Sequence, residues 1–301
     1  NMSAYDGISL FTNNEELKAV LGGQFGDYGP TTKKANFFIH ASIVNHYLEG
    51  GYFPRGGSGI IAKKIIPVIE KAGGRVLVGK KVNSILQDLN GDVFGVEMEN
   101  GDRIRCKNVV SGVGLSNTFN NLIEPESKEV KKYLELNKKI GPSTGFIYCF
   151  VNLKGNPDEL ELRDSNLWIY PNKDYDKMLE DFEKNILKNP MPLFIACTCA
   201  KDSDWPNRYS DKSSAIILTL GKKEWFEEWE NEKCMKRNLD YQDLKEELGK
   251  RMLEEGLYKY YPKTKAKVEN IEIGTPLTNQ FYLGAVSGEG YGLDSNVYRF
   301  S

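Results

Sequence analysis

Apolar residues recur along the chain at spacings typical of helices in several segments. Residues 14–24 and 37–48 repeat apolar positions every three or four residues, so each predicts a helix, the second one buried. Residues 60–74 have the same period and contain Pro67, which predicts a kink or an early break. Residues 225–262 predict one long or two consecutive amphipathic helices with charge pairs four residues apart.

Other segments have the pattern of strands. The stretch 75–115 predicts a strand and then a hairpin that turns at Asn100-Gly101, a dipeptide that favours tight hairpin turns. Residues 268–284 predict a last strand followed by a loop, and residues 121–140 predict a charged helix. Four nearly continuous apolar runs of strand length are 143–152, 167–171, 192–200 and 214–220. Together these runs predict a sheet with at least one dry face.

The composition indicates a folded protein without a nucleic-acid surface. The 301 residues include 40 Lys and Arg against 42 Asp and Glu, and 40% are hydrophobic. This length suits one large or two ordinary domains. Lys and Glu are interleaved, so no nucleic-acid partner is expected. No apolar run approaches the ~18 residues of a membrane span, and no signal peptide opens the sequence. Because the sequence opens on Asn1 and stops after a glycine-rich turn, an internal fragment is expected.

Cysteines and histidines do not form a metal-binding pattern. The five scattered cysteines predict reduced core thiols and an intracellular protein. His40 and His46 stand six apart on a predicted helix, which places them on different faces. Cys197 and Cys199 would share a face of a predicted strand, but no second pair completes four ligands. No metal site is therefore expected.

Catalytic motifs with a nucleophile or a dinucleotide fingerprint are also absent from the sequence. It contains neither G-x-S-x-G nor G-x-G-x-x-G, and no general acid or base can be named. The segment 25–30 (FGDYGP) predicts a turn-rich loop. RGGSG at 55–59 precedes a predicted helix, so its amides could hold an anion or a flavin edge, although it could also be an ordinary loop. SGEGYGLD at 287–294 is a second glycine-rich segment, for which a surface turn is the simplest interpretation.

Several longer motifs occur in an order that is typical of one family. They are YFPRGGSGIIAKKIIPVIEKAGG within 52–86, NVVSGVG at 108–114, AKDSDWPNRYSDKSSAIILTL at 200–220, EWFEEWE at 224–230 and GTPLTNQFYLGAVSGEGYGLD at 274–294. Through them the chain resembles the carotenoid isomerase and phytoene desaturase flavoproteins, and among these the retinol saturase branch. The resemblance covers roughly residues 20–300.

The resemblance implies an α/β fold with two parts. One is the central part of an FAD/NAD(P)-binding, glutathione reductase-like fold that lacks its N-terminal Rossmann unit, and the other is a mixed-sheet substrate domain. The implied division is 1–52 as a helical part of the substrate region, 53–115 as a segment of the FAD domain, 116–283 as the substrate domain and 284–301 as the start of the return to the FAD domain.

Five implied cofactor-binding residues lie in the first half of that FAD segment. Arg55, Gly56, Gly57 and Ser58 match the family's PRGGS/T loop, which lies towards the flavin and the substrate. Val82 stands where the family's strand gives backbone contacts to the adenine.

Five further implied cofactor contacts lie later in the chain. Ser111 and Gly112 match the step at the end of the hairpin, near the cofactor, although VSGVG stands where relatives often have VSNAG. Gly290, Tyr291 and Gly292 match the segment that approaches the flavin ring.

The resemblance also implies an activity and a place in the cell. It implies an FAD-dependent oxidoreductase of retinol or carotenoid metabolism that saturates, desaturates or isomerises a carbon–carbon double bond of a polyene, with NAD(P)H as a candidate electron donor. Because such substrates partition into lipid, peripheral association with the endoplasmic reticulum membrane is implied. Candidates to face an apolar tunnel, or simply to pack, are Phe146, Tyr148, Phe150, Trp168, Tyr170 and Phe194.

Two other functions remain open at this point. A non-catalytic isoprenoid carrier of the Rab escort or GDP-dissociation inhibitor type shares the broad fold. An inactive, truncated pseudo-enzyme is the other alternative, because the chain lacks the glycine fingerprint for FAD.

Overall fold

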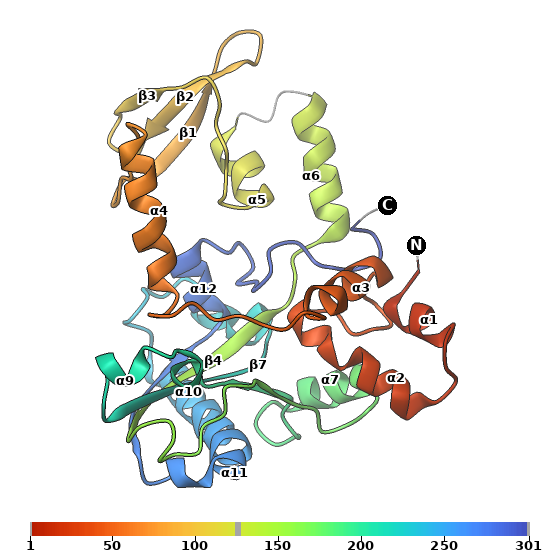
Figure 1. Ribbon diagram of the computed structural model, residues 1–301. Coiled ribbons are helices and arrows are strands. Elements are labelled where there is room, and N and C mark those ends of the chain that lie inside the picture. Colours follow the sequence, from red (N-terminus) through yellow and green to blue (C-terminus); the bar gives the residue numbers. More distant parts are fainter. Residues whose placement is uncertain (1, 124–127, 300–301) are drawn as a thin grey trace. The chain divides into compact units, whose positions relative to one another are not determined.

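The computed structural model describes residues 2–123 and 128–299 (Figure 1). Its contacts divide the chain into two compact units. The large unit comprises Asn1–Ile61 and Pro142–Ser301, and the small unit comprises Ala62–Gly141. Each unit has its own sheet together with helices, which confirms the α/β class. The division into flavin and substrate domains at 53, 116 and 284 follows other boundaries and remains a prediction.

The large unit is built on a five-stranded sheet in the order β5-β6-β7-β4-β8. Its strands are β4 (Gly145–Lys154), β5 (Leu167–Ile169), β6 (Leu193–Ala196), β7 (Lys212–Gly221) and β8 (Val268–Gly274). The four apolar runs and the last predicted strand are thus all confirmed. Every pairing between these strands is antiparallel, so the expected mixed sheet is antiparallel over the described strands.

One face of this sheet carries the main core. Successive side chains of a strand point to opposite faces, so the odd positions Ile147 and Cys149 of β4 and Ile217 of β7 lie together, completely buried. They pack with Leu248 and Met252 from the helical layer. That layer consists of η3 (Lys223–Trp229), α10 (Leu239–Arg251), η4 (Met252–Leu257), α11 (Tyr258–Tyr260) and η5 (Pro262–Thr264). The sequence predicted either one long helix or consecutive helices for 225–262, and the structure has consecutive helices.

The N-terminal helices form a second, smaller core with α7 (Tyr175–Lys184). They are α1 (Ala4–Ser9), α2 (Glu15–Gly22), η1 (Gly23–Asp27) and α3 (Phe37–His46). The helices expected at 14–24 and 37–48 are confirmed, and Asn14 caps α2 by accepting the N–H groups of Glu16 and Leu17. The expected burial of α3 is wrong, since only His40 is buried and Phe38 is 65% exposed.

Two local expectations in the large unit are also wrong. The segment after β8 is a helix, α12 (Pro276–Leu283), rather than a loop, because Thr275 caps it and proline fits its first turn. Cys197 and Cys199 do not share a strand, since β6 ends at Ala196 and a short helix follows. The short helices here are α8 (Thr198–Lys201) and α9 (Trp205–Arg208). All five cysteines are free thiols, and Cys149, Cys197 and Cys199 are buried.

The small unit contains the predicted hairpin. Strands β1 (Val82–Gln87), β2 (Val93–Met98) and β3 (Arg103–Arg105) pair antiparallel, and Gly101 takes the positive φ of +85° that the turn requires. Helix α4 (Gly59–Lys71) continues through Pro67, so the early break is wrong. The remaining elements are α5 (Leu115–Asn117), η2 (Thr118–Leu122) and α6 (Lys128–Ile140). Part of the helix expected at 121–140 falls on 124–127, outside the described residues.

Candidate functional site

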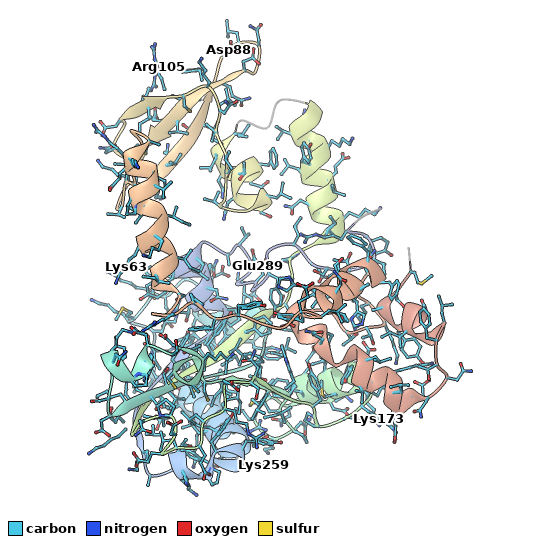
Figure 2. The ribbon with its side chains drawn as sticks, in the orientation of Figure 1. Lys63, Asp88, Arg105, Lys173, Lys259 and Glu289 are labelled. Atoms are coloured by element: carbon cyan, nitrogen blue, oxygen red, sulfur yellow. The ribbon has the colours of Figure 1, made fainter. Side chains whose placement is uncertain are left out.

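The second face of the large sheet carries aromatic and aliphatic side chains in cross-strand rows. Trp168 pairs with Phe194, Phe194 with Leu218 and Leu218 with Tyr148, so one row runs through β5, β6, β7 and β4. The rings of Trp168 and Phe194 lie 4.5 Å apart, between centroids. These residues are only half-buried, whereas Ile147, Ile195 and Ile217 on the other face are completely buried in the core. The side chains of the large unit are drawn in Figure 2. The sheet therefore presents an apolar surface that its own helices leave partly open.

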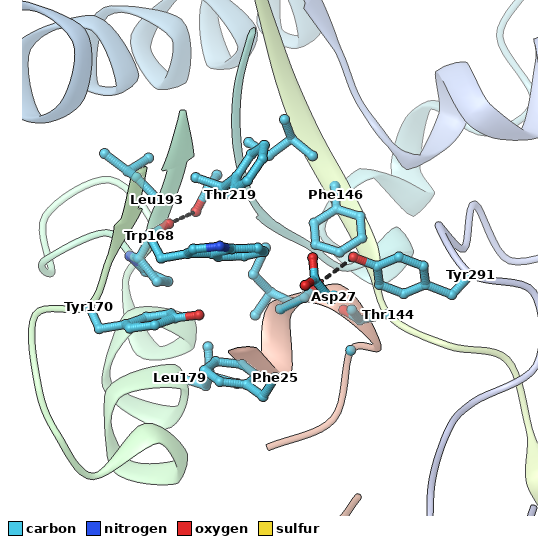
Figure 3. Close-up of a pocket in the computed structure, with 16 residues that line it drawn as sticks. Phe25, Asp27, Thr144, Phe146, Trp168, Tyr170, Leu179, Leu193, Thr219 and Tyr291 are labelled. Carbon is cyan, nitrogen blue, oxygen red and sulfur yellow. Dashed lines mark hydrogen bonds between the residues drawn. The ribbon is translucent and has the colours of Figure 1, made fainter. Parts of the chain in front are cut away.

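A cavity of about 160 Å³ lies on this surface (Figure 3). One wall comes from η1 and the turn after it, and another from Tyr291. Of the six aromatic candidates, four line the cavity: Phe146, Trp168, Tyr170 and Phe194. The other two, Tyr148 and Phe150, stack with centroids 6.0 Å apart and are not among the lining residues.

Glycine allows the η1 wall to approach the sheet closely. A Cβ placed on Gly26 would lie 2.0 Å from the Trp168 ring, so no other residue fits without moving the indole or the turn. Gly290 plays the same part on the wall formed by Tyr291, where a Cβ would lie 2.6 Å from Phe146. The backbone therefore closes over both aromatic rings only because these two positions lack a side chain.

Tyrosine hydroxyls fix the position of the η1 wall. The hydroxyl of Tyr170 donates to the carbonyl of Gly23 at 2.5 Å, and that of Tyr291 donates to the carbonyl of Gly26. The neighbouring Tyr175 donates to the carbonyl of Ala19 at 2.6 Å. Because burial disfavours the phenolate, the pKa of each of these tyrosines is raised, and they remain donors at neutral pH.

Among the described residues that line the cavity, Asp27 is the only charged one. Burial raises the pKa of the Asp27 carboxyl. A hydrogen bond with the Gln24 side chain lowers the pKa and so offsets part of that rise. In Figure 3 the carboxyl lies close to Phe146 and Tyr291. The sequence did not single out this residue, because FGDYGP predicts only a turn and the partner tyrosines come from distant segments.

The predicted glycine loop at 55–58 forms a separate cluster around Asp202. Gly56 and Gly57 have φ of +94° and +81°, and the amide of Gly56 donates to Asp202 at 2.8 Å. The amide of Gly57 donates to the carbonyl of Pro54 at 3.0 Å. Both amides are therefore already engaged inside the chain, and the expectation that they are free to hold an anion is wrong for these two positions.

Asp202 is a nearly fully buried carboxylate with several donors. Besides the Gly56 amide it accepts the N–H of Asp204 at 2.9 Å and the guanidinium of Arg208. Burial alone would raise its pKa, but the two amides and Arg208 outweigh that effect and hold the pKa of Asp202 below its ordinary value. Arg55, by contrast, is 72% exposed and pairs with Asp204 at 3.5 Å, which is the arrangement of a surface ion pair.

The predicted residues 290–292 lie at the cavity. Tyr291 lines it, and the amide of Gly290 donates to the carbonyl of Thr144 at 2.9 Å. Gly292, at a φ of +69°, accepts the amide of Ser143 at 2.8 Å. This segment therefore packs along the start of β4.

The last three predicted contacts belong to the small unit. Val82 opens β1, and the hydroxyl of Ser111 lies 2.6 Å from that of Thr118. Gly112 is exposed, and a Cβ there would meet no atom within 4 Å. Whether any of the ten predicted residues contacts a flavin stays a prediction.

Within residues 2–123 and 128–299, no three His, Cys, Asp or Glu side chains gather as metal ligands would. No helix among the described residues combines the length and the apolar character needed to cross a bilayer.

Comparison with known proteins identifies relatives of this chain. Residues 2–242 match the model of the family described as flavin containing amine oxidoreductase. The all-trans-retinol 13,14-reductase of Danio rerio is 38% identical over 307 residues, which cover 99% of this chain and 50% of that protein. The chloroplastic prolycopene isomerase of Daucus carota is 27% identical over 255 residues, covering 83% of this chain and 38% of that protein.

A solved structure has a fold similar to that of this chain. An oxidoreductase from Methanosarcina mazei superposes with a TM-score of 0.57 at 16% identity, over 91% of this chain and 56% of that one. The chain spans about half the length of the curated retinol reductases that it matches, 50% in the case of Danio rerio. Since the family model covers well over half of the sequence, the chain belongs to the flavin-containing amine oxidoreductase family.

Proposed function

We propose that this chain is the substrate-binding half of an FAD-dependent oxidoreductase that acts on a carbon–carbon double bond of a retinoid or carotenoid polyene. The observation that carries the proposal is the apolar cavity on the open face of the large sheet, with aromatic side chains from β4, β5 and β6 around it. The names of the relatives, a retinol reductase and a prolycopene isomerase, indicate the same substrate class.

The size of the cavity limits what it can hold. Ligand sites for drug-sized molecules usually measure about 300–1,000 Å³, and this cavity measures about 160 Å³. It is therefore suited to one end or a short stretch of a long polyene rather than to the whole molecule. The apolar lining would exclude water and orient the chain by van der Waals contact.

The chain's fit to FAD is partial. Gly56, Gly57 and Gly292 have positive φ and no side chain, so the backbone at these positions could approach a flat ring system closely. The amides of Gly56 and Gly57 are engaged, so contacts to the FAD phosphates would come from other residues. FAD would supply the hydride chemistry. The ten predicted cofactor contacts, the flavin role of 53–115 and the substrate role of 116–283 are parts of this proposal.

Two further parts concern the surroundings of the enzyme. We infer NAD(P)H as the electron donor, because saturation of a double bond consumes two electrons that must be supplied. We also infer peripheral association with the endoplasmic reticulum membrane, because a polyene substrate is stored in lipid. The apolar lining of the cavity supports the second inference, because it suits a lipid-soluble substrate.

A pair of substitutions on one strand tests the proposal. Leu218 lines the cavity, and Ile216 lies two residues away on the same face of β7 without lining it. We expect Leu218→Trp to fill the cavity and to lower kcat/KM for all-trans-retinol or prolycopene at least ~10-fold in the full-length protein. Ile216→Trp should retain most of the activity and flavin content. Equal effects of the two changes would contradict the proposed site, and binding of polyenes without turnover at full flavin content would favour a carrier.

A further inference from the structure

The cavity contains one carboxyl group, that of Asp27, with which an apolar hydrocarbon cannot form a hydrogen bond. Of the lining residues that the structure describes, Asp27 alone is charged, and most of the others are aromatic or aliphatic. The four hydroxyl groups among the described lining residues are already engaged. Tyr170 donates to the carbonyl of Gly23 at 2.5 Å, and Thr144 donates to that of Gly145 at 3.3 Å. Thr219 donates to the carbonyl of Pro192 at 2.7 Å, and Tyr291 donates to the carbonyl of Gly26. The carboxyl of Asp27 is therefore the polar group best placed to meet a ligand.

A carboxyl in such a place is costly unless something compensates for it. Burial of a polar group in an apolar environment is unfavourable without full hydrogen bonding. The Gln24 side chain hydrogen-bonds the Asp27 carboxyl, but a carboxyl has more than one site for a partner. Burial raises its pKa, and in either protonation state the carboxyl keeps an oxygen that accepts a hydrogen bond. An alcohol hydroxyl donates such a bond and carries no charge, and is therefore a matched partner.

The wall that holds Asp27 is well positioned for this purpose. Asp27 is the last residue of η1, whose backbone is fixed by the hydroxyls of Tyr170 and Tyr291. Gly26 beside it lies against the indole of Trp168. The carboxyl thus belongs to a braced wall of the cavity and not to a free surface loop.

We propose that Asp27 hydrogen-bonds the terminal hydroxyl of a polyene alcohol and selects such alcohols over hydrocarbon polyenes. The inference rests on the proposed function, because it takes the cavity to be the polyene site. The small volume agrees with it, since a cavity of about 160 Å³ accommodates an end of the chain, where the hydroxyl is located. A pocket with a group that requires a hydroxyl partner discriminates against ligands that lack one.

Ligand binding to the full-length protein tests this inference directly. The two probes are all-trans-retinol and the same polyene with a methyl group in place of the hydroxymethyl group, and the readout is quenching of tryptophan fluorescence. We expect the unchanged protein to bind the alcohol about 10-fold to 100-fold more tightly than the hydrocarbon, as a hydrogen bond to a buried carboxyl would give. Similar affinities for both probes would overturn the inference even without any variant.

Substitutions then assign the selectivity to the residue. Asp27→Leu should remove most of the preference by weakening retinol binding, while hydrocarbon binding is unchanged or tighter. Asp27→Asn, which still donates and accepts, should restore part of it. Asp294→Leu is the matched control, because Asp294 is also a partly buried carboxyl with a raised pKa but does not line the cavity. Melting temperatures show that each variant is folded.

The outcomes separate this inference from the proposed function. Equal weakening of both probes by Asp27→Leu would show a packing role and would refute selection by the carboxyl, while the cavity would still be the polyene site. Failure of the unchanged protein to bind either probe, together with no effect of Leu218→Trp, would refute the proposed function itself.

Discussion

Two aspartates show how the surroundings of a single residue decide its role. Asp202 is buried among donors, and its pKa is held low by the amides of Gly56 and Asp204 and by Arg208. Asp27 lies among apolar side chains, and burial raises its pKa. The first carboxyl therefore stays ionised and organises the loop at 54–58, whereas the surroundings of the second disfavour its charge, so that it is suited to meet a neutral polar group.

The ionised Asp202 makes stability depend on pH. Its pKa is lower in the folded chain than the ordinary 3.8, so its contribution is complete above that value and is lost as the pH falls below it. We expect Asp202→Asn to lower the free energy of unfolding by about 1–3 kcal/mol at pH 7, because buried donors lose a charged partner. The difference from the unchanged protein should shrink below about pH 4.

Urea unfolding at several pH values measures this effect, with Asp204→Asn as the control, since Asp204 is more exposed and forms surface ion pairs. A loss of stability that does not change with pH would contradict the assignment. Limited proteolysis near Gly56 should also become faster in Asp202→Asn, because the Gly56 amide then has only an uncharged oxygen as its acceptor.

At the scale of elements, continuous apolar runs predicted the strands but not their faces. In FIYCFVN and SAIILTL, apolar residues fill both faces, so only the pairing of β4 with β7 shows that Ile147 faces the helices and Phe146 the cavity. The helix α12 was missed although Thr-Pro is a helix-start signal there. Four of the six aromatic candidates do line the cavity. Asp27 could not be predicted, because it becomes part of a site only when the fold brings Tyr291, which is distant in sequence, next to its turn.

The contact between η1 and β5 gives a prediction at this scale. Gly26→Ala places a methyl group inside the Trp168 ring, so the turn or the indole must move. We expect a loss of about 1–3 kcal/mol in the free energy of unfolding and a red-shifted tryptophan emission. Gly51→Ala is the control, because a Cβ there would meet no atom within 4 Å and its φ is ordinary. If Gly26→Ala left the free energy of unfolding unchanged, the prediction would be wrong, because the η1 turn could then move away from Trp168 at no cost.

At the scale of the whole molecule, the two units differ in how well they cover apolar side chains. The large unit has a well-buried core, whereas no residue of α4 is buried, and Val78 and Val110 are 87% and 96% exposed. In the small unit the core side chains Ile85 and Met98 are 8% and 7% exposed, whereas Ile147 and Ile217 of the large unit are completely buried. The small unit therefore gains less stability from the burial of apolar surface.

A last prediction concerns FAD retention by residues 1–301. The sequence lacks G-x-G-x-x-G, and the amides of Gly56 and Gly57 are engaged, so no phosphate cradle of that kind is present in either place. We expect the purified chain to retain well below one equivalent of flavin, measured by its absorbance near 450 nm against protein concentration. Retention near one equivalent would contradict this expectation and would point to phosphate contacts elsewhere in the chain.

The hydrogen bond from Tyr291 to Gly26 joins residues 265 positions apart. During synthesis the sheet strands up to β7 and the η1 segment emerge before Tyr291, so the cavity remains without one wall until Tyr291 has left the ribosome. Closing such a long loop comes late, because its entropy cost must be met before the contact forms. Nascent chains therefore expose this apolar face to solvent until Tyr291 emerges, which makes it a natural binding site for chaperones.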